Sequence, residues 1–138
     1  MAYLDINFLA VLVAAVVTFA LGALWYSPLL FARQWVAAHG YSPEQVEAMR
    51  KHTGPAYGVT FVCWLAMAAA LAVLTQRIGV DTVLGGLKLG ALCWAGFAAT
   101  VGLSGLMFSE KRLPAYLIDA GYQLVSLLGM GVILAIWP

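Results

Sequence analysis

The chain has 138 residues, of which 64% are hydrophobic and 9% are charged, and its formal net charge is +1. Ordinary soluble domains are about one-quarter charged, so this composition excludes a soluble globular domain. A near-neutral chain without a basic run is also not typical of a protein that binds nucleic acid.

Four long apolar stretches dominate the sequence. A helix rises about 1.5 Å per residue, so about 20 apolar residues cross the ~30 Å hydrocarbon core of a bilayer. The stretches are continuous rather than alternating, which favours helices over the strands of a membrane barrel. The sequence therefore predicts an all-α polytopic membrane protein, a four-transmembrane-helix bundle that forms one membrane domain over residues 1–138. The spans are predicted at residues 7–26, 56–76, 83–108 and 113–137.

The first predicted span ends in Trp25 and Tyr26, which are followed by Ser27 and Pro28. Aromatic side chains with an apolar ring and a polar tip are typical of the membrane interface. Proline disfavours helix at the residue before it, so the span should end here. This pattern favours an anchoring role for Trp25 and Tyr26. The alternative is that both frame a binding pocket together with Asp119, which lies at a similar depth.

The connection between the first two spans, residues 27–55, is the one long polar region of the sequence. Its first part, residues 28–38, is amphipathic enough to lie as a helix at the lipid headgroups. Ser42, Pro43 and Gln45 then match an N-cap, a proline at the first helical position and a capping-box glutamine. A second short helix is therefore predicted from Pro43, ending before Gly54.

The basic residues predict how the chain is oriented. Short loops rich in lysine and arginine stay on the cytoplasmic side. The connection between spans two and three has only Arg77, set against Asp81, whereas the other two connections are basic. We therefore expect a multi-pass membrane protein with both termini outside and a cytoplasmic connection between helices 1 and 2. The basic connections contain Arg33, Arg50, Lys51, Lys111 and Arg112.

Small residues recur at four-residue spacing in the spans, most clearly at Gly86 and Gly90 in the third. Such spacing lets membrane helices approach closely. It serves packing within one chain and association between chains alike. The partners expected from this pattern are the lipid bilayer and either a second copy of the chain, in a homo-oligomer, or another membrane protein.

Asp119 is the residue that most invites a functional interpretation, because an ionisable group inside a span is costly and marks a candidate site. Tyr116, Gln123 and Ser126 follow 3, 4, 3 spacing with it, so all four share one helical face. Two interpretations remain open. Asp119 is a ligand or proton site, or it is held in a structural contact. The candidate structural partners are Lys111, Arg112, Arg33, Trp25 and Tyr26.

Motifs of enzymes are missing from the sequence. There is no phosphate-binding glycine loop, no zinc-ligand spacing, no plausible Ser-His-Asp set and no haem-ligating histidine within a span. Four potential metal ligands in the long connection have poor spacing and fit an ordinary solvated helix face better. We therefore expect no catalytic residue, no metal and no cofactor. The four residues are His39, Glu44, Glu47 and His52.

The end of the first span reads Gly22-Ala23-Leu24-Trp25-Tyr26-Ser27-Pro28, and the last span contains Leu117-Ile118-Asp119-Ala120-Gly121-Tyr122-Gln123. In both segments the chain resembles the bacterial family called domain of unknown function 1761. Its members are small integral membrane proteins with a Gly-x-x-Trp-Tyr-Ser-Pro signature after the first span. The resemblance extends over essentially the whole chain and implies a membrane fold, located in the inner (cytoplasmic) membrane of a bacterium. It implies no activity, and no catalytic residue can be carried over.

Two functional hypotheses follow. The first is a non-enzymatic membrane protein that binds or transports a small molecule or proton through a cleft near Asp119. The second is a structural or accessory subunit whose small-residue surfaces dock onto a larger membrane complex.

Overall fold

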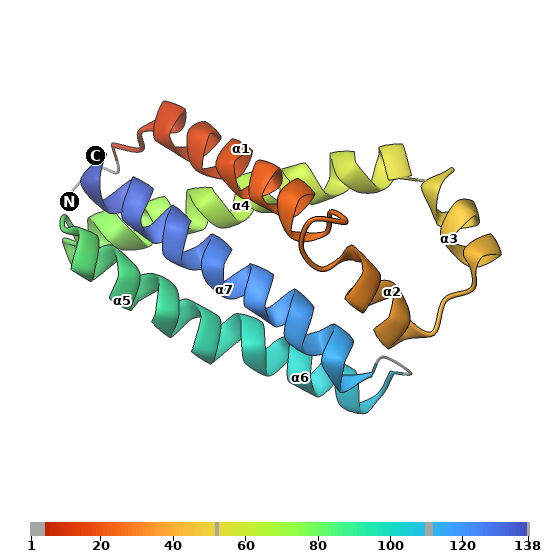
Figure 1. Ribbon diagram of the computed structural model, residues 1–138. Helices are drawn as coiled ribbons and strands as arrows, with labels where there is room; N and C mark the ends of the chain where they lie inside the picture. Colours follow the sequence, from red (N-terminus) through yellow and green to blue (C-terminus); the bar gives the residue numbers. More distant parts are fainter. Residues whose placement is uncertain (1–4, 52, 110–111, 138) are drawn as a thin grey trace.

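The computed structural model describes residues 5–51, 53–109 and 112–137. The described chain is built from helices (Figure 1). Four helical stretches are long and apolar enough to cross a membrane, the third of them made of three consecutive segments. The predicted all-α, four-helix membrane bundle is therefore confirmed. In chain order the segments are α1 (Phe8–Trp25), α2 (Ala32–His39), α3 (Pro43–Arg50), α4 (Thr53–Ile78), α5 (Val83–Cys93), the π-helical turn η1 (Trp94–Ala98), α6 (Ala99–Met107) and α7 (Leu113–Ile136).

Helix α7 occupies the centre of the bundle and contacts α1, α2, α4, α5 and α6. Helix α1 packs on both α4 and α7, while α5 and α6 run along the other side of α7 (Figure 1). At one end of the bundle α1 begins and α7 ends, and we call this the termini end. At the opposite end lie α2 and α3, and we call this the connection end.

The hydrophobic core cluster lies mostly toward the termini end. Small side chains from α1 and α4 meet larger ones from α7, so the helices interlock with little space between them. We call the central part of this region the apolar core layer. It consists of the buried residues Ala14, Ala68, Leu71, Leu127 and Met130.

The closest contact between helices joins α5 to α7. A Cβ atom placed on Gly86 would lie 2.5 Å from the carbonyl oxygen of Gly131, and one on Gly90 would lie 2.5 Å from that of Leu127. Only glycine allows two backbones to approach this far. The four-residue glycine spacing predicted from the sequence therefore serves packing within the chain at these two positions.

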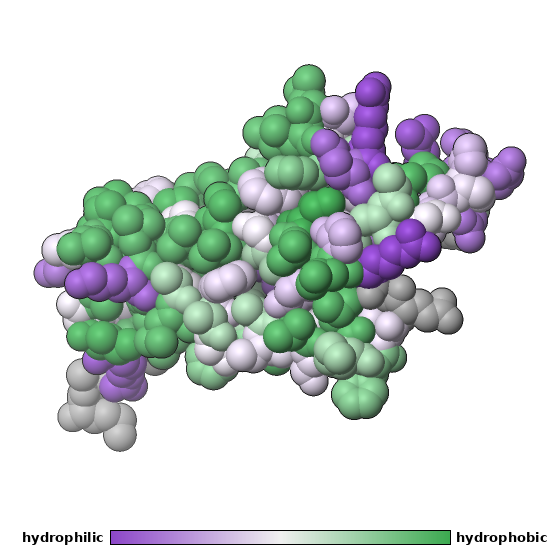
Figure 2. Space-filling view, turned by 60° about the horizontal axis from the view of Figure 1, so that its bottom comes forward, coloured by the Kyte–Doolittle hydropathy of each residue, from purple (hydrophilic) through white to green (hydrophobic). Residues whose placement is uncertain are grey.

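The face of the bundle shown in Figure 2 is mostly apolar along its length and polar toward its two ends. Large hydrophobic side chains such as Phe97 and Val101 are 67% and 72% exposed. In water such exposure would be unfavourable, whereas in a bilayer these side chains contact lipid. The distribution is that of a membrane protein.

The first short helix begins later than the sequence predicted. Helix α2 begins at Ala32 rather than at Pro28, because residues 27–31 form a tight turn. In this turn the Leu30 amide donates to the Ser27 carbonyl, and the Phe31 amide donates to the Trp25 carbonyl. The turn reverses the chain so that α2 folds back against α7.

Two local features of the spans were not predicted. Helix α4 begins at Thr53, so Pro55 lies in its first turn, where the missing amide is not needed. The third span is interrupted by η1, and its Trp94 indole donates a 2.9 Å hydrogen bond to the carbonyl of Ala120 on α7. A π-helical turn re-aims side chains along a helix, which here brings this indole to α7.

The predicted capping box at the start of α3 is confirmed. The Gln45 amide donates to the Ser42 hydroxyl at 3.2 Å, and the Ser42 amide donates to the Gln45 side chain at 2.7 Å. Both bonds satisfy amides that the first turn leaves unpaired.

Replacing Ser42 with alanine should destabilise α3 by about 1 kcal/mol. Faster hydrogen exchange at the Gln45 and Val46 amides would report the loss. Exchange in α7 should be unchanged, and a uniform acceleration throughout the chain would contradict a local capping role.

Candidate functional site

Asp119 lies on α7 toward the connection end, where three segments meet at one carboxylate oxygen. The Tyr26 hydroxyl donates to Asp119 Oδ1 at 2.6 Å, and the Trp35 indole Nε1 donates to the same oxygen at 3.1 Å. Hydrogen bonds to a charged acceptor are shorter and stronger than neutral ones. We call these three residues the Asp119 site.

The end of α1 explains how Tyr26 reaches this position. Tyr26 is the residue after the last one of α1, and its amide still donates to the Gly22 carbonyl. The Ser27 hydroxyl donates to the Leu24 carbonyl at 2.6 Å, which satisfies another group at the helix end. The side chain of Tyr26 is therefore held by a capped helix end and directed at α7.

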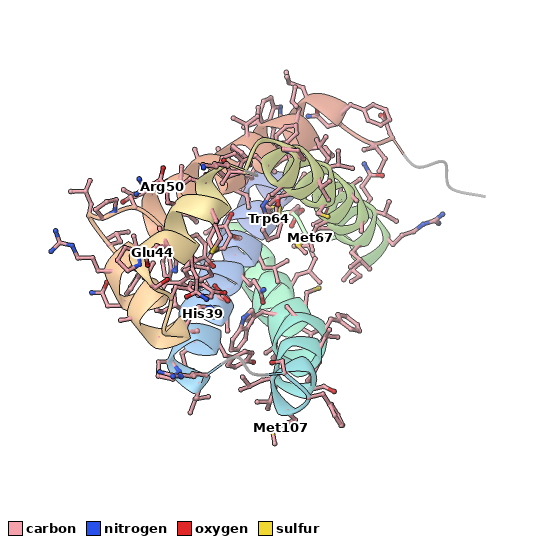
Figure 3. All side chains as sticks on the ribbon, turned by 90° about the vertical axis from the view of Figure 1, so that its right-hand side faces the viewer. His39, Glu44, Arg50, Trp64, Met67 and Met107 are labelled. Carbon is pink, nitrogen blue, oxygen red and sulfur yellow. The ribbon has the colours of Figure 1, made fainter. Side chains whose placement is uncertain are left out.

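Helix α2 brings Trp35 to the site from the other side. Because the turn at residues 27–31 reverses the chain, α2 packs across the start of α7. In the view onto the connection end, α2 and α3 lie on one side of α7, whereas α6 lies on another (Figure 3). The Trp35 ring contacts the Tyr26 ring edge to face, with centroids 6.2 Å apart.

Further aromatic rings pack against one another next to the Asp119 site. Tyr122 lies edge to face against Tyr26 at 5.5 Å, and the Trp25 ring lies 4.8 Å from that of Phe31. Beyond Trp35, the His39 ring lies at 4.3 Å. Asp119 is half-buried, and hydrogen bonds are stronger where water is partly excluded.

Two glycines create the space that these rings fill. A Cβ atom on Gly22 would lie 2.7 Å from the Tyr122 hydroxyl, which donates to the Thr18 carbonyl at 2.7 Å. A Cβ atom on Gly121 would lie 3.2 Å from the Trp25 ring. Small residues at these positions thus bring α1 and α7 close enough for the aromatic contacts to form.

The other residues of the predicted polar face of α7 meet different neighbours. The Tyr116 hydroxyl donates to the Ala99 carbonyl on α6 at 2.8 Å. Gln123 is half-buried, and Ser126 is buried within the bundle, two turns of α7 away from Asp119. The four residues share a helical face, but the face meets different segments along its length.

The residues predicted as structural partners of Asp119 also have different contacts from one another. Tyr26 donates to it, whereas the Trp25 indole donates to the Ile118 carbonyl at 3.0 Å. The Arg112 guanidinium lies against Gly40. Lys111 is outside the described residues.

The sequence pattern does not assign Trp35 or Tyr122 to the site. It places Trp35 only on the apolar face of an amphipathic helix, and the partner of this side chain depends on how the turn folds that helix back. Tyr122 lies three residues after Asp119, on an adjacent part of the same helical surface. That spacing is the available signal for Tyr122, and no comparable signal exists for Trp35.

Two polar side chains next to the site, those of Trp64 and Ser126, lie in the middle of the bundle. The Trp64 indole and the buried Ser126 hydroxyl approach the Tyr122 hydroxyl, yet neither has hydrogen-bond geometry with a described residue. Past Ser126, toward the termini end, the apolar core layer begins. No group of three or more His, Cys, Asp or Glu side chains suited to a metal ion occurs among the described residues, and His52 lies outside them.

The family described as "Protein of unknown function (DUF1761)" matches residues 9–135, which is nearly the whole chain. The chain belongs to this family. The match extends from α1 to α7 and so includes every residue of the Asp119 site. The family description states no activity, and no curated protein and no solved structure matches the chain.

Proposed function

We propose that this chain is a non-enzymatic membrane protein that binds a small cation or a proton at the Asp119 site. The observation that supports this best is the carboxylate itself. An ionisable group within a span is expensive to retain, and here α1, α2 and α7 each contribute to holding it. A half-buried carboxylate attracts positive charge through its Coulomb interaction.

The apolar core layer favours binding from one side over conduction through a pore. A hydrated ion crossing that layer would lose its water without gaining polar partners. Transport by this chain therefore requires a second conformation in which the layer opens. For the conformation described here we propose binding. Transport would be a further step that uses the second conformation.

The side from which the ligand comes follows from the basic residues. Arg33, Arg50 and Arg112 lie at the connection end, and the positive-inside rule assigns that end to the cytoplasm. The proposal therefore gives the Asp119 site a cytoplasmic approach in a bacterial inner membrane, with both termini outside.

Protonation of Asp119 in lipid nanodiscs tests the proposal. We expect the Trp35 indole ¹⁵N resonance to shift with pH as Asp119 gains a proton, since the indole donates directly to it. Asp119→Asn should abolish that shift. Glu44→Gln, which removes one exposed carboxylate on α3, should leave it intact. An indole resonance that is insensitive to pH would contradict proton binding at Asp119.

Vesicles containing the protein then separate binding from transport. With a pH-sensitive dye inside, a proton flux that Asp119→Asn abolishes and Glu44→Gln preserves would extend the proposal to transport. Titration without flux would restrict it to binding.

A second candidate function, an accessory subunit or homo-oligomer, is favoured by the outer surface of the third span. Only 11% of the most apolar 18-residue stretch of this span is buried in the bundle. This is so although the mean hydropathy of the span is the lowest of the four. Thr100 and Ser104 are exposed there, and a Cβ atom placed on Gly96 or Gly105 would have no neighbour within 4 Å. Native mass spectrometry from nanodiscs distinguishes the cases. A single-chain species would count against both forms of association.

A further inference from the structure

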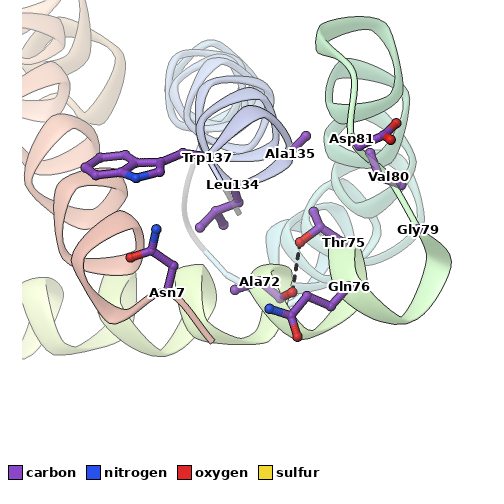
Figure 4. Close-up of a pocket in the computed structure, with 10 residues that line it drawn as sticks. All are labelled: Asn7, Ala72, Thr75, Gln76, Gly79, Val80, Asp81, Leu134, Ala135 and Trp137. Atoms are coloured by element: carbon purple, nitrogen blue, oxygen red, sulfur yellow. Dashed lines mark hydrogen bonds between the residues drawn. The ribbon is translucent and has the colours of Figure 1, made fainter. Parts of the chain in front are cut away.

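Figure 4 shows a cavity of about 190 Å³ at the termini end of the bundle. Polar residues interrupt its walls, among them Asn7, Thr75, Gln76 and Asp81. The Thr75 hydroxyl donates to the Ala72 carbonyl at 2.8 Å, so this group is held within the chain. Walls interrupted by polar groups do not suit an alkyl chain, which would leave those groups without water.

A second cavity, which we call the α1–α4 groove, has a different lining. Its volume is about 430 Å³, and its lining residues are Val16, Phe19, Ala20, Tyr57, Gly58 and Phe61. Apart from the Tyr57 hydroxyl, these side chains are apolar. Val16 is 49% exposed and Tyr57 is 58% exposed, so the groove opens on the side of the bundle, where lipid chains lie.

Aromatic rings fix the shape of the α1–α4 groove. The Phe19 ring of α1 lies edge to face against two rings of α4, with centroids 5.9 Å from Tyr57 and 5.8 Å from Phe61. Between these two α4 residues, a Cβ atom placed on Gly58 would have no other atom within 4 Å. The groove thus combines mutually supported rings with a position that lacks a side chain, and an alkyl chain lying there gains dispersion contacts with all three rings.

The depth of the groove places the polar part of a lipid at the connection end. Tyr57 lies four residues after Thr53, the first residue of α4, which is about 6 Å along the helix axis. Exposed tyrosines are typical of the membrane interface, and the Tyr57 hydroxyl can donate to an ester or phosphate oxygen. An acyl chain in the groove therefore has its headgroup near the beginning of α4.

The backbone and one side chain supply positive charge at that level. Arg50 is paired with Glu47 at 3.8 Å, and both side chains are exposed. Lys51, the next residue, is exposed and forms no salt bridge with any residue that the structure describes. It precedes α4 by two residues, and the first turn of a helix adds partial positive charge. This charge is complementary to a headgroup that carries a phosphate and no ammonium.

We propose that the α1–α4 groove binds an anionic phospholipid, with one acyl chain against Phe19, Gly58 and Phe61 and the headgroup near Lys51. One lysine at an anionic membrane surface corresponds to a preference of about fivefold for phosphatidylglycerol over phosphatidylcholine, whose own ammonium offsets its phosphate. The groove contains no residue of the Asp119 site, so a failure of Asp119 to titrate would leave this proposal standing.

Spin-labelled lipids test the proposal on the full chain in phosphatidylcholine nanodiscs. The probes are phosphatidylglycerol and phosphatidylcholine, each with a nitroxide on one acyl chain and each added at the same low mole fraction. We expect phosphatidylglycerol to broaden the Phe61 amide resonance about fivefold more than phosphatidylcholine does. Gly96, which is exposed to lipid on the third span, is the reference amide and should show a much smaller difference.

Two pairs of variants separate the acyl chain from the headgroup. Gly58→Leu fills the groove and should remove the excess broadening at Phe61, whereas Gly96→Leu, which also adds a side chain in open space, should preserve it. Lys51→Gln should remove the preference between the two lipids, whereas Arg77→Gln at the termini end should preserve it.

Three results would overturn the proposal. They are equal broadening of Phe61 by both lipids, a difference that survives Gly58→Leu, and a difference that survives Lys51→Gln. Native mass spectrometry of Gly58→Leu tests the other possible occupant of the groove. A change in the number of chains per nanodisc would assign the groove to a second copy of the chain and would also overturn the proposal, whereas an unchanged number supports the lipid.

Discussion

Alanine at Gly86 is expected to lower the free energy of unfolding by about 2 kcal/mol. The added Cβ atom would lie 2.5 Å from a backbone oxygen of Gly131, a contact that no side-chain rotation can relieve. The helices must therefore separate, which also removes the contacts of Gly90 with Leu127. Reversible unfolding in mixed micelles measures the loss.

Gly105→Ala is the matched control for that substitution. Gly105 lies in α6, and a Cβ atom added there would have no other atom within 4 Å, so alanine adds a methyl group without a collision. Since alanine also favours helix over glycine, this variant should be as stable as the wild type or slightly more so. Equal losses at Gly86 and Gly105 would show that the α5–α7 contact does not limit stability.

Phenylalanine at Tyr26 is the second substitution with a large expected effect. It removes the 2.6 Å hydrogen bond to Asp119 while keeping the ring contacts with Trp35 and Tyr122. We expect a loss of about 1 to 2 kcal/mol in the free energy of unfolding, as for a hydrogen bond to a charged group within a membrane protein. The Trp35 indole proton should also exchange faster, because Asp119 is then held by one donor fewer.

Tyr57→Phe controls for the loss of a tyrosine hydroxyl. Tyr57 is 58% exposed on α4 and contacts Phe19 through its ring. This variant should leave both stability and Trp35 exchange unchanged. A double-mutant cycle of Tyr26→Phe with Asp119→Asn should be non-additive, because both changes remove the same bond. Additive losses would contradict a direct coupling.

Features set by nearby residues were predictable from the sequence. The apolar stretches predicted the four-helix membrane bundle, and Ser42 with Gln45 predicted a capping box that the structure contains. Both depend on interactions within one helix or with lipid. The contact between Tyr26 and Asp119 is among the alternatives that the sequence leaves open, because helical rise places the two at a similar depth.

Features that depend on how segments fold onto each other were not predictable. The partner of Trp35 depends on the turn at residues 27–31, whose geometry shifts the start of α2 by four residues. The π-helical turn at Trp94–Ala98 has no signature in hydropathy. The cavity beside Asp81 forms between ends of helices that are distant in sequence, so no local pattern marks it.

The glycine contact between α5 and α7 also limits which parts of the molecule can move. Two backbones that touch directly have no side chains between them whose rotamers could change, so sliding one helix along the other would create a collision at each step. We therefore expect α5 and α7 to move as one rigid unit. Helix α2 is different, because it is short, has no fully buried residue and is joined to α7 through Trp35. If the Asp119 site opens, we expect α2 to move away from α7, with the turn at residues 27–31 as the hinge.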